Sequence, residues 1–337
     1  MGYPGYPGYS GYPPPGYGYP PPGYPPPSGY PGPPGYPAWK PGVIPLRPLS
    51  LTDIFNGAVA YVRANPKPTL GLTTVIILIT TVIGFVSSLL MSTTDGTLQA
   101  AAGAVTGGLA SLLATVLLSG MLTVIVGRSV LGYPITASEA WQRVRPRMLA
   151  LIGLTLLEIA VAVLIIAATI LAIIGITHAA GGVIATLIGI PLGLAAIAGL
   201  AYLSTSLLLA PAAIVLERRN IPDAIRRSLS LIRGRFWRVL GIMLLAGITV
   251  GFVAAAISVP FSIAGSVITL GAGPHTPTIG GTIVATVGQA IGQIIVTPFL
   301  AGVTTLLYVD ARIRSEAFDL TLMGRGAGDA DSVWLGR

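Results

Sequence analysis

The stretch LERRNIPDAIRRSLSLIRGRFWRVL, residues 216–240, lies between two long apolar runs and contains the strongest local pattern in the chain. Asn220 supplies a helix cap, Pro222 suits a first turn, and Asp223 stands three residues after the cap as a capping-box acid. Apolar or small residues then recur at helical spacing. The stretch therefore predicts an amphipathic helix that lies in a membrane surface.

This stretch also holds seven of the 19 lysine and arginine residues: Arg218, Arg219, Arg226, Arg227, Arg233, Arg235 and Arg238. On the predicted helix, Arg226, Arg227 and Arg233 fall opposite the apolar face and point toward lipid phosphates. One interpretation is that basic residues beside membrane spans simply set orientation. The other is that the seven arginines bind anionic lipid headgroups or an acidic partner, since each contributes about 1 kcal/mol near an anionic surface.

The composition of the whole chain is that of a membrane protein. Only 9% of the 337 residues are charged, where about 25% is usual, and the mean hydropathy is +0.81. Such a chain cannot cover its surface with polar groups, so part of its solvent is lipid. Six apolar runs are each long enough to cross about 30 Å of hydrocarbon, at 70–91, 105–126, 149–174, 184–209, 239–259 and 283–309. The sequence predicts an all-α membrane protein with six transmembrane helices.

The basic residues predict the orientation. With six spans, both termini and the second and fourth connections share one side of the membrane, and all 19 lysines and arginines fall there. The opposite loops, about 92–104, 175–183 and 260–282, hold none. The positive-inside rule therefore predicts that both termini are cytoplasmic. Because every basic residue flanks a span, the net charge of +8 indicates an anionic membrane surface and argues against nucleic acid as a partner.

A sequence unit recurs at intervals of about 85 residues. Each copy begins with a capping residue three positions before an acid: Ser50–Asp53, Thr136–Glu139 and Asn220–Asp223. Helically spaced apolar residues follow each cap. Pro66, Pro68 and Pro146 are placed to end the first two amphipathic helices before their spans. This pattern predicts three repeats of a cytoplasmic amphipathic helix followed by a transmembrane hairpin.

The first 42 residues are predicted to form a disordered cytoplasmic tail. Up to position 38 they are Tyr, Pro and Gly with four exceptions, so they lack the aliphatic side chains that a core requires. The tail is either a plain flexible segment or a multivalent arm whose tyrosines bind protein partners or other copies of the chain. The membrane domain is predicted to span 43–315, followed by a short cytoplasmic tail at 316–337.

Several motifs around the opening stretch resemble a known family signature. They are PAAIVLE at 211–217, Ala224, RRS at 226–228 and GRFWR at 234–238. Together they resemble the glycerophosphoryl diester phosphodiesterase membrane-domain family, in particular its proline- and glycine-rich bacterial integral membrane proteins. The resemblance covers about 43–315 and implies a six-helix domain of uncharacterised role in the bacterial inner membrane. It does not include the phosphodiesterase catalytic domain, so it implies no hydrolysis.

No catalytic or metal-binding constellation is visible in the sequence. The two histidines, His178 and His275, have no acidic or histidine neighbours at ligand spacing, and the chain has no cysteine. We therefore expect a protein that is not an enzyme and that needs neither a cofactor nor a metal.

Two intramembrane features are candidates for function. Glu158 is the one ionisable residue well inside a predicted span, about 15 Å deep by the helical rise. It is either functional, as intramembrane acids often are, or a hydrogen-bonded structural residue. The last span carries polar residues spaced by three or four along one face: Thr286, Gln289, Gln293 and Thr297. This stripe either joins helices or lines a polar pathway.

These patterns favour a non-enzymatic scaffold or accessory protein that organises partners or lipids at the cytoplasmic face of the membrane. Its expected partners are anionic lipid headgroups and, through the N-terminal tail, proteins or other copies of the chain. The alternative is a carrier or channel for a lipid-like or small polar solute that uses Glu158 and the polar face of the last helix.

Overall fold

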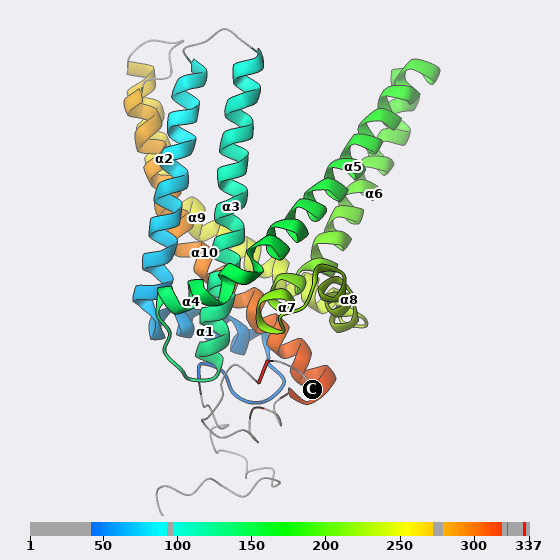
Figure 1. The fold of residues 1–337 in the computed structure, drawn as a ribbon. Coiled ribbons are helices and arrows are strands. Elements are labelled where there is room, and N and C mark those ends of the chain that lie inside the picture. The colour runs from blue at the N-terminus through cyan, green and yellow to red at the C-terminus, as the bar shows by residue number, and fades with distance from the viewer. Residues whose placement is uncertain (1–41, 93–96, 272–278, 319–321, 323–332, 335–337) are drawn as a thin grey trace, which may run out of the picture. The chain divides into compact units, whose positions relative to one another are not determined.

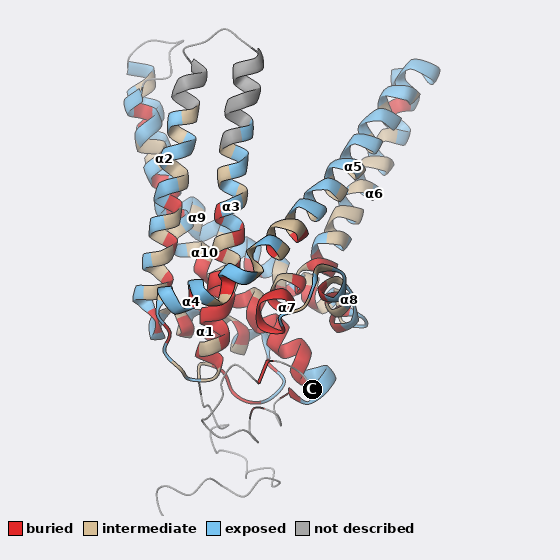
Figure 2. Ribbon diagram, in the orientation of Figure 1, coloured by how far each residue is buried: buried red, intermediate tan, exposed pale blue. Residues whose placement is uncertain are grey.

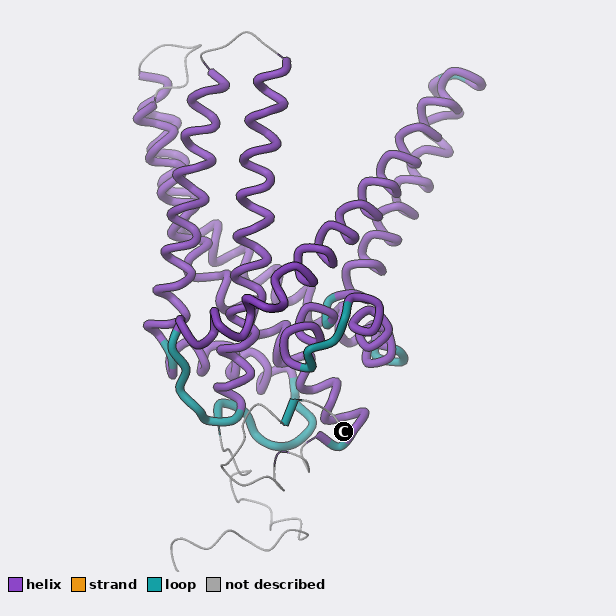
Figure 3. Tube along the Cα trace, in the orientation of Figure 1, coloured by secondary structure: helices purple, strands orange, loops and turns teal. Residues whose placement is uncertain are grey.

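A computed structural model of the chain describes residues 42–92, 97–271, 279–318, 322 and 333–334. Within these ranges all regular structure is helical (Figure 3). Six helical stretches are long and apolar enough to cross a membrane. The predicted all-α class with six membrane-spanning helices is thus confirmed. Residues 1–41, His275 and most of the predicted C-terminal tail lie outside the described residues.

The six long helices coincide with the predicted apolar runs. They are α2 (Leu72–Ser92), α3 (Thr97–Val130), α5 (Met148–Ala180), α6 (Gly182–Leu207), α9 (Phe236–Gly271) and α10 (Ile279–Glu316). Most exceed their predicted spans, and prolines within them do not end them: Pro191, Pro260 and Pro298 all lie inside helices. The 38 residues of α10 extend about 57 Å, so one end must project beyond about 30 Å of hydrocarbon.

Three short helices begin where the caps were predicted: α1 (Leu51–Ala64), α4 (Ala137–Val144) and α8 (Ile221–Ile232). Ser50 and Asp53 form a complete capping box, and the Thr136 side chain accepts a hydrogen bond from the backbone of Glu139. Asn220 occupies the cap position of α8, but its side chain makes no capping bond. A π-helical turn (Lys67–Gly71) follows α1 and a 3-10 turn (Arg145–Arg147) follows α4, so both helices end at the predicted prolines.

The apolar faces of α1 and α8 pack against protein, which differs from the expected position in the membrane surface. On α1, Ile54, Ala58 and Tyr61 are fully buried, and the Tyr61 hydroxyl donates to the carbonyl of Pro298 on α10. On α8, Ala224, Leu231 and the other inward residues are buried as well. The reason is that neighbouring helices offer an apolar protein surface, chiefly α10 to α1 and chiefly α7 and α6 to α8, which the sequence pattern cannot distinguish from lipid.

A side chain of α8 forms hydrogen bonds with the backbone at a break in the fourth span. The helix α6 stops at Leu207, and the separate helix α7 (Ala210–Leu216) continues the chain. At this break the Ser228 hydroxyl of α8 donates to the carbonyl of Ser206 at 2.7 Å and accepts from the backbone N–H of Leu209 at 3.3 Å. Backbone groups freed by the break are therefore satisfied inside the protein, as buried polar groups require.

The buried core gathers at the end of the domain where α1, α4, α7 and α8 lie (Figure 2). There the end of α10 is almost wholly buried, with Val303, Leu306 and Tyr308 at 0% exposure. By contrast the long helices expose leucines, isoleucines and valines along their length toward the other end, as expected of surfaces that face lipid. We call the buried end the base of the domain. The second and third cytoplasmic segments predicted from the charges, α4 and α8, both lie at this base (Figure 1).

Candidate functional site

The base is organised around a buried carboxylate, Glu217, at the end of α7. Its side chain is only 2% exposed. Arg227 of α8 donates to it from Nε at 3.0 Å and from Nη2 at 2.9 Å, and Arg219 and the hydroxyl of Tyr308 also donate to it. Arg312 lies 3.6 Å away and is itself nearly buried. One acid thus connects α7, α8 and α10.

The surroundings of Glu217 keep it ionised. Burial alone raises the pKa of the Glu217 carboxyl, but hydrogen bonds from Arg227, Tyr308 and Arg219 outweigh it and hold the pKa below its usual range. Although burial opposes the charge of Arg227, its contacts with Glu316 and Glu217 raise the pKa of its guanidinium. The cluster is therefore a fully charged network in the protein interior, and its geometry is that of a structural element.

A second buried acid, Asp310, joins the beginning of the domain to its end. It accepts from the backbone N–H of Leu49 at 2.8 Å and pairs with Arg314 at 2.9 Å and with Arg238 of α9. Arg238 and Arg314 also donate to the carbonyl of Leu49, at 2.7 and 2.9 Å. The segment that leads into α1 is thus fixed to α9 and α10.

The structure divides the seven predicted arginines into two groups. Arg219, Arg227 and Arg238 pair with buried acids, and Arg235 donates to the carbonyl of Arg314 at 3.1 Å. Arg227 therefore points into the protein, whereas the helical pattern predicted that it would point outward. Arg218, Arg226 and Arg233 are exposed. Arg226 approaches Asp223 at 3.8 Å, and the described residues offer no ion pair to the other two.

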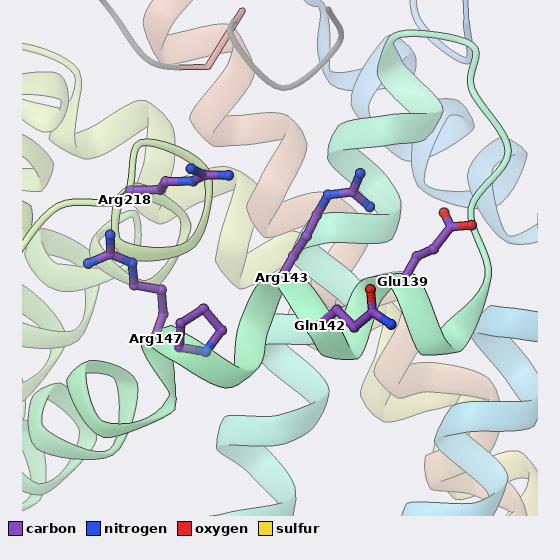
Figure 4. Close-up of a pocket in the computed structure, with 6 residues that line it drawn as sticks. Glu139, Gln142, Arg143, Arg147 and Arg218 are labelled. Carbon is purple, nitrogen blue, oxygen red and sulfur yellow. The ribbon is translucent and has the colours of Figure 1, made fainter.

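A basic cavity of about 410 Å³ opens at the base. Arg143 of α4, Arg147 of the following turn and Arg218 line it together with Glu139, Gln142 and Pro146. In Figure 4, Arg218 extends from the segment after α7, and the other labelled side chains extend from α4 and the turn that follows it. Among the residues described as lining the cavity, three are arginines and one is a glutamate, so this lining carries a net positive charge. We call it the arginine cavity.

The backbone at Arg218 is unusual and positions this side chain. Its φ is +56°, in the left-handed region that side chains rarely occupy. The residue directly follows the buried Glu217, so the left-handed turn ends α7 and directs the next side chain outward. A smaller hollow of about 40 Å³ adjoins the arginine cavity, shares Arg143 and Arg218 with it, and adds Arg128 and Trp334.

A second recess, which we call the polar crevice, runs between α2, α3 and α10. It consists of two hollows of about 320 and 300 Å³ that share Thr80, Ser111 and Gln293. Thr286, Gln289 and Gln293 line the first hollow, and Gln293 and Thr297 line the second. The structure therefore brings the four predicted polar residues of the last span to one recess. Leu208, Pro211 and Ala212 lie at its other end, near the base.

Glu158 is not part of either recess. It lies on α5 with a partly exposed side chain, and neither the arginine cavity nor the polar crevice includes it. The structure thus does not bring Glu158 together with the polar residues of α10. In the part of the chain that is described, no three histidine, aspartate or glutamate side chains are grouped so that they could hold a metal ion.

Some site residues were missed by the sequence interpretation. Arg143 and Arg147 were counted only as determinants of orientation, although their spacing of four places them on one side of a helical turn. The threonines and serines of α3 that line the crevice, Ser111, Thr115, Ser119 and Thr123, also recur every four residues. Phe318 and Trp334, in the predicted C-terminal tail, are buried, and Phe318 packs its ring 4.0 Å from the guanidinium of Arg312.

The fold and these sites define a multi-pass, all-helical membrane protein. Residues 181–322 match the family model described as the membrane domain of glycerophosphoryl diester phosphodiesterase. The match confirms the resemblance found in the sequence and runs from the start of α6 past the end of α10, so it includes both buried acids. Searches of curated proteins and of solved structures found no match.

Proposed function

We propose that this protein is a non-enzymatic scaffold of the bacterial inner membrane that binds the phosphate groups of anionic lipids in the arginine cavity. The observation that carries this proposal is the convergence of Arg143, Arg147 and Arg218 on one recess. Guanidinium groups donate paired hydrogen bonds that match phosphate oxygens, and three of them around one recess suit a phosphodiester anion. The arginines that pair with Glu217 and Asp310 hold the base in shape around this cavity.

The position of the cavity supports a lipid as the ligand. It adjoins the start of α5, where the membrane-spanning segment begins, so a headgroup there would have its acyl chains beside the spans. Trp237 at the start of α9 is 81% exposed and Trp141 of α4 is 39% exposed. Exposed tryptophans at the ends of spans are typical of the boundary between headgroups and hydrocarbon.

The proposal includes an orientation with the base and both termini in the cytoplasm. It rests on the positive-inside rule, because all lysines and arginines flank that side of the predicted spans. A membrane-impermeant thiol reagent tests it in intact cells, because the chain has no native cysteine. His178→Cys, at the opposite end of α5, should react before lysis, and Ser138→Cys on α4 only afterwards. The reverse result would overturn the orientation.

The three-repeat architecture and a partner-binding role of the N-terminal tail belong to the same proposal. The corresponding caps at the starts of α1, α4 and α8 support the repeats, and the regular tyrosines of the tail support contacts with proteins or other copies. Deleting residues 1–38 should leave the membrane domain folded but remove partners that are crosslinked to the full chain. An unchanged set of crosslinked partners would contradict this part of the proposal.

Lipid retention tests the headgroup site directly. The full chain is placed in nanodiscs of mixed phosphatidylglycerol and phosphatidylcholine, and the lipids that remain bound are measured by native mass spectrometry. Arg147→Gln should reduce phosphatidylglycerol retention about fivefold, which corresponds to roughly 1 kcal/mol per basic residue. Arg226→Gln removes the same charge from an exposed position outside the cavity and is the matched control. Equal losses in both variants would show only general electrostatic attraction and would refute the site.

A carrier that combines Glu158 with the polar face of α10 receives less support. The two features belong to different parts of the domain and line no common recess among those described. The crevice remains a separate feature that the scaffold proposal does not explain.

A further inference from the structure

Six of the ten hydroxyl-bearing residues that line the polar crevice use their hydrogen-bond donor within their own helix. Thr80, Thr115, Ser119, Thr123, Thr286 and Thr304 each donate to a backbone carbonyl of the preceding turn of their own helix. The oxygen lone pairs of these side chains remain as acceptors. The crevice therefore presents a surface that accepts hydrogen bonds from donors such as hydroxyl groups.

Two carboxamides add both donors and acceptors. Gln289 and Gln293 both line the crevice, and neither forms a hydrogen bond with another described residue. A carboxamide in a membrane span is costly unless water, protein or a ligand satisfies it. The two glutamines therefore mark the part of the crevice where hydrogen bonds to a polar ligand would stabilise the complex most.

The contacts argue against the interpretation that this stripe joins helices. If it did, its side chains would hydrogen-bond to neighbouring helices. Instead Thr286 bonds within α10, and the described part of the chain offers Gln289, Gln293 and Thr297 no partner on α2 or α3. Between α3 and α10, the Thr305 hydroxyl donates to the Thr123 hydroxyl oxygen at 3.5 Å, which is long for a hydrogen bond. Of these two residues only Thr123 lines the crevice.

The absence of charge along the crevice restricts the ligand. None of the residues that line its two hollows is ionisable. A charged ligand would have no counter-charge in a region of low dielectric constant, so an uncharged one is favoured. The hollow nearer the base is mainly apolar, with Leu118, Leu122 and Leu300 among its lining, and so accommodates a hydrocarbon portion.

We infer that the polar crevice binds an uncharged, hydroxyl-bearing group that is either a free polyol or the headgroup of a neutral lipid. The hydroxyls of the ligand donate to the threonine and serine oxygens, and the carboxamides of Gln289 and Gln293 accept and donate at the same level. The volumes of the two hollows, about 320 and 300 Å³, lie in the range of small-molecule sites. This site is separate from the arginine cavity, so either proposal can fail alone.

Thiol labelling tests the accessibility of the crevice. Ser111→Cys keeps both glutamines, and Ile295→Cys on α10 is an exposed control outside the crevice. In phosphatidylglycerol nanodiscs, Ser111→Cys should react with a water-soluble thiol reagent about tenfold faster than Ile295→Cys, because a thiol in hydrocarbon does not ionise. Circular dichroism confirms that each variant is folded. Equal rates would overturn the inference.

Protection by added ligands then identifies the source. Glycerol and diacylglycerol are each added to Ser111→Cys, and His178→Cys, outside the crevice, controls for effects on the reagent itself. Slower labelling with glycerol indicates a free polyol, and slower labelling with diacylglycerol alone indicates a neutral lipid. In either case Gln293→Leu in the same background should abolish the protection. If neither compound protects, or if Gln293→Leu leaves protection unchanged, the inference is wrong.

Discussion

Arg227 of α8 donates two hydrogen bonds to the carboxylate of Glu217 at the end of α7, from Nε at 3.0 Å and from Nη2 at 2.9 Å. The same arginine also pairs with Glu316 near the end of α10. It therefore holds together parts of the chain that the sequence separates widely. Arg227, which the sequence pattern places on an exposed basic face, instead links α7, α8 and α10 inside the base.

Replacing Glu217 by Ala should destabilise the protein strongly. Without this carboxylate, Arg227 and Arg312 lose a shared buried counter-charge, and breaking a buried pair by removing one partner costs about 3–5 kcal/mol. Thermal unfolding in nanodiscs measures the effect. Asp223→Asn is the control, because its pair with Arg226 is exposed and its loss should change stability by less than about 1 kcal/mol. Similar effects of the two substitutions would contradict the structural role of Glu217.

The stability of the base should fall in acid. Because the pKa of Glu217 is lowered in the folded state, its carboxylate stabilises the fold above the unfolded pKa of about 4.3. That contribution is lost as the pH falls from this value through the lower folded pKa. The unfolding temperature of the native chain should therefore drop over this range. Glu217→Gln, which has no carboxyl to protonate, should show a smaller drop, and parallel curves would refute the assignment.

The membrane-spanning class could be predicted because it depends on quantities that the sequence states directly. Long apolar runs and sparse charges specify helices in lipid, and Ser50, Thr136 and Pro146 mark local ends through their own backbone chemistry. These features require no knowledge of which segments meet. The positions of the six long helices and the starts of α1, α4 and α8 were accordingly found from the sequence alone.

Long-range contacts were not predictable in the same way. The hydrophobic pattern of α8 shows an apolar face but not whether lipid or other helices cover it, and so the inward direction of Arg227 was missed. The arginine cavity escaped prediction because Arg218 joins Arg143 and Arg147 only through tertiary packing. The polar face of α10 was found because it lies within one helix, whereas its partners on α2 and α3 depend on how the helices pack.

Arg218→Gly should move stability and lipid binding in opposite directions. Glycine tolerates the left-handed φ of +56° that costs another residue about 1–2 kcal/mol, so the variant should unfold at a higher temperature. It also removes one guanidinium from the arginine cavity, so phosphatidylglycerol retention should fall about fivefold. Arg233→Gly, at an exposed position outside the cavity, should retain the lipid. A loss of both stability and retention in Arg218→Gly would mean that the residue acts only through folding.

Gly302→Ala tests the close approach of α1 to α10. A methyl group at this position would lie 2.5 Å from a ring carbon of the buried Tyr61 and 3.1 Å from the Cα of Ala58. Because Tyr61 is enclosed and also bonds to Pro298, it cannot simply move aside, and such overpacking costs about 1–3 kcal/mol.

Gly241→Ala is the matched control for Gly302→Ala. It makes the same change inside α9, where nothing lies within 4 Å of the added methyl group. Alanine is favoured over glycine in a helix by about 1 kcal/mol, so this variant should be as stable as the native chain or more stable. Opposite shifts of the two unfolding temperatures would establish that α1 is held against α10 and does not lie in lipid. A neutral or stabilising effect of Gly302→Ala would contradict this packing, because it would mean that α1 and its Tyr61 lie farther from α10.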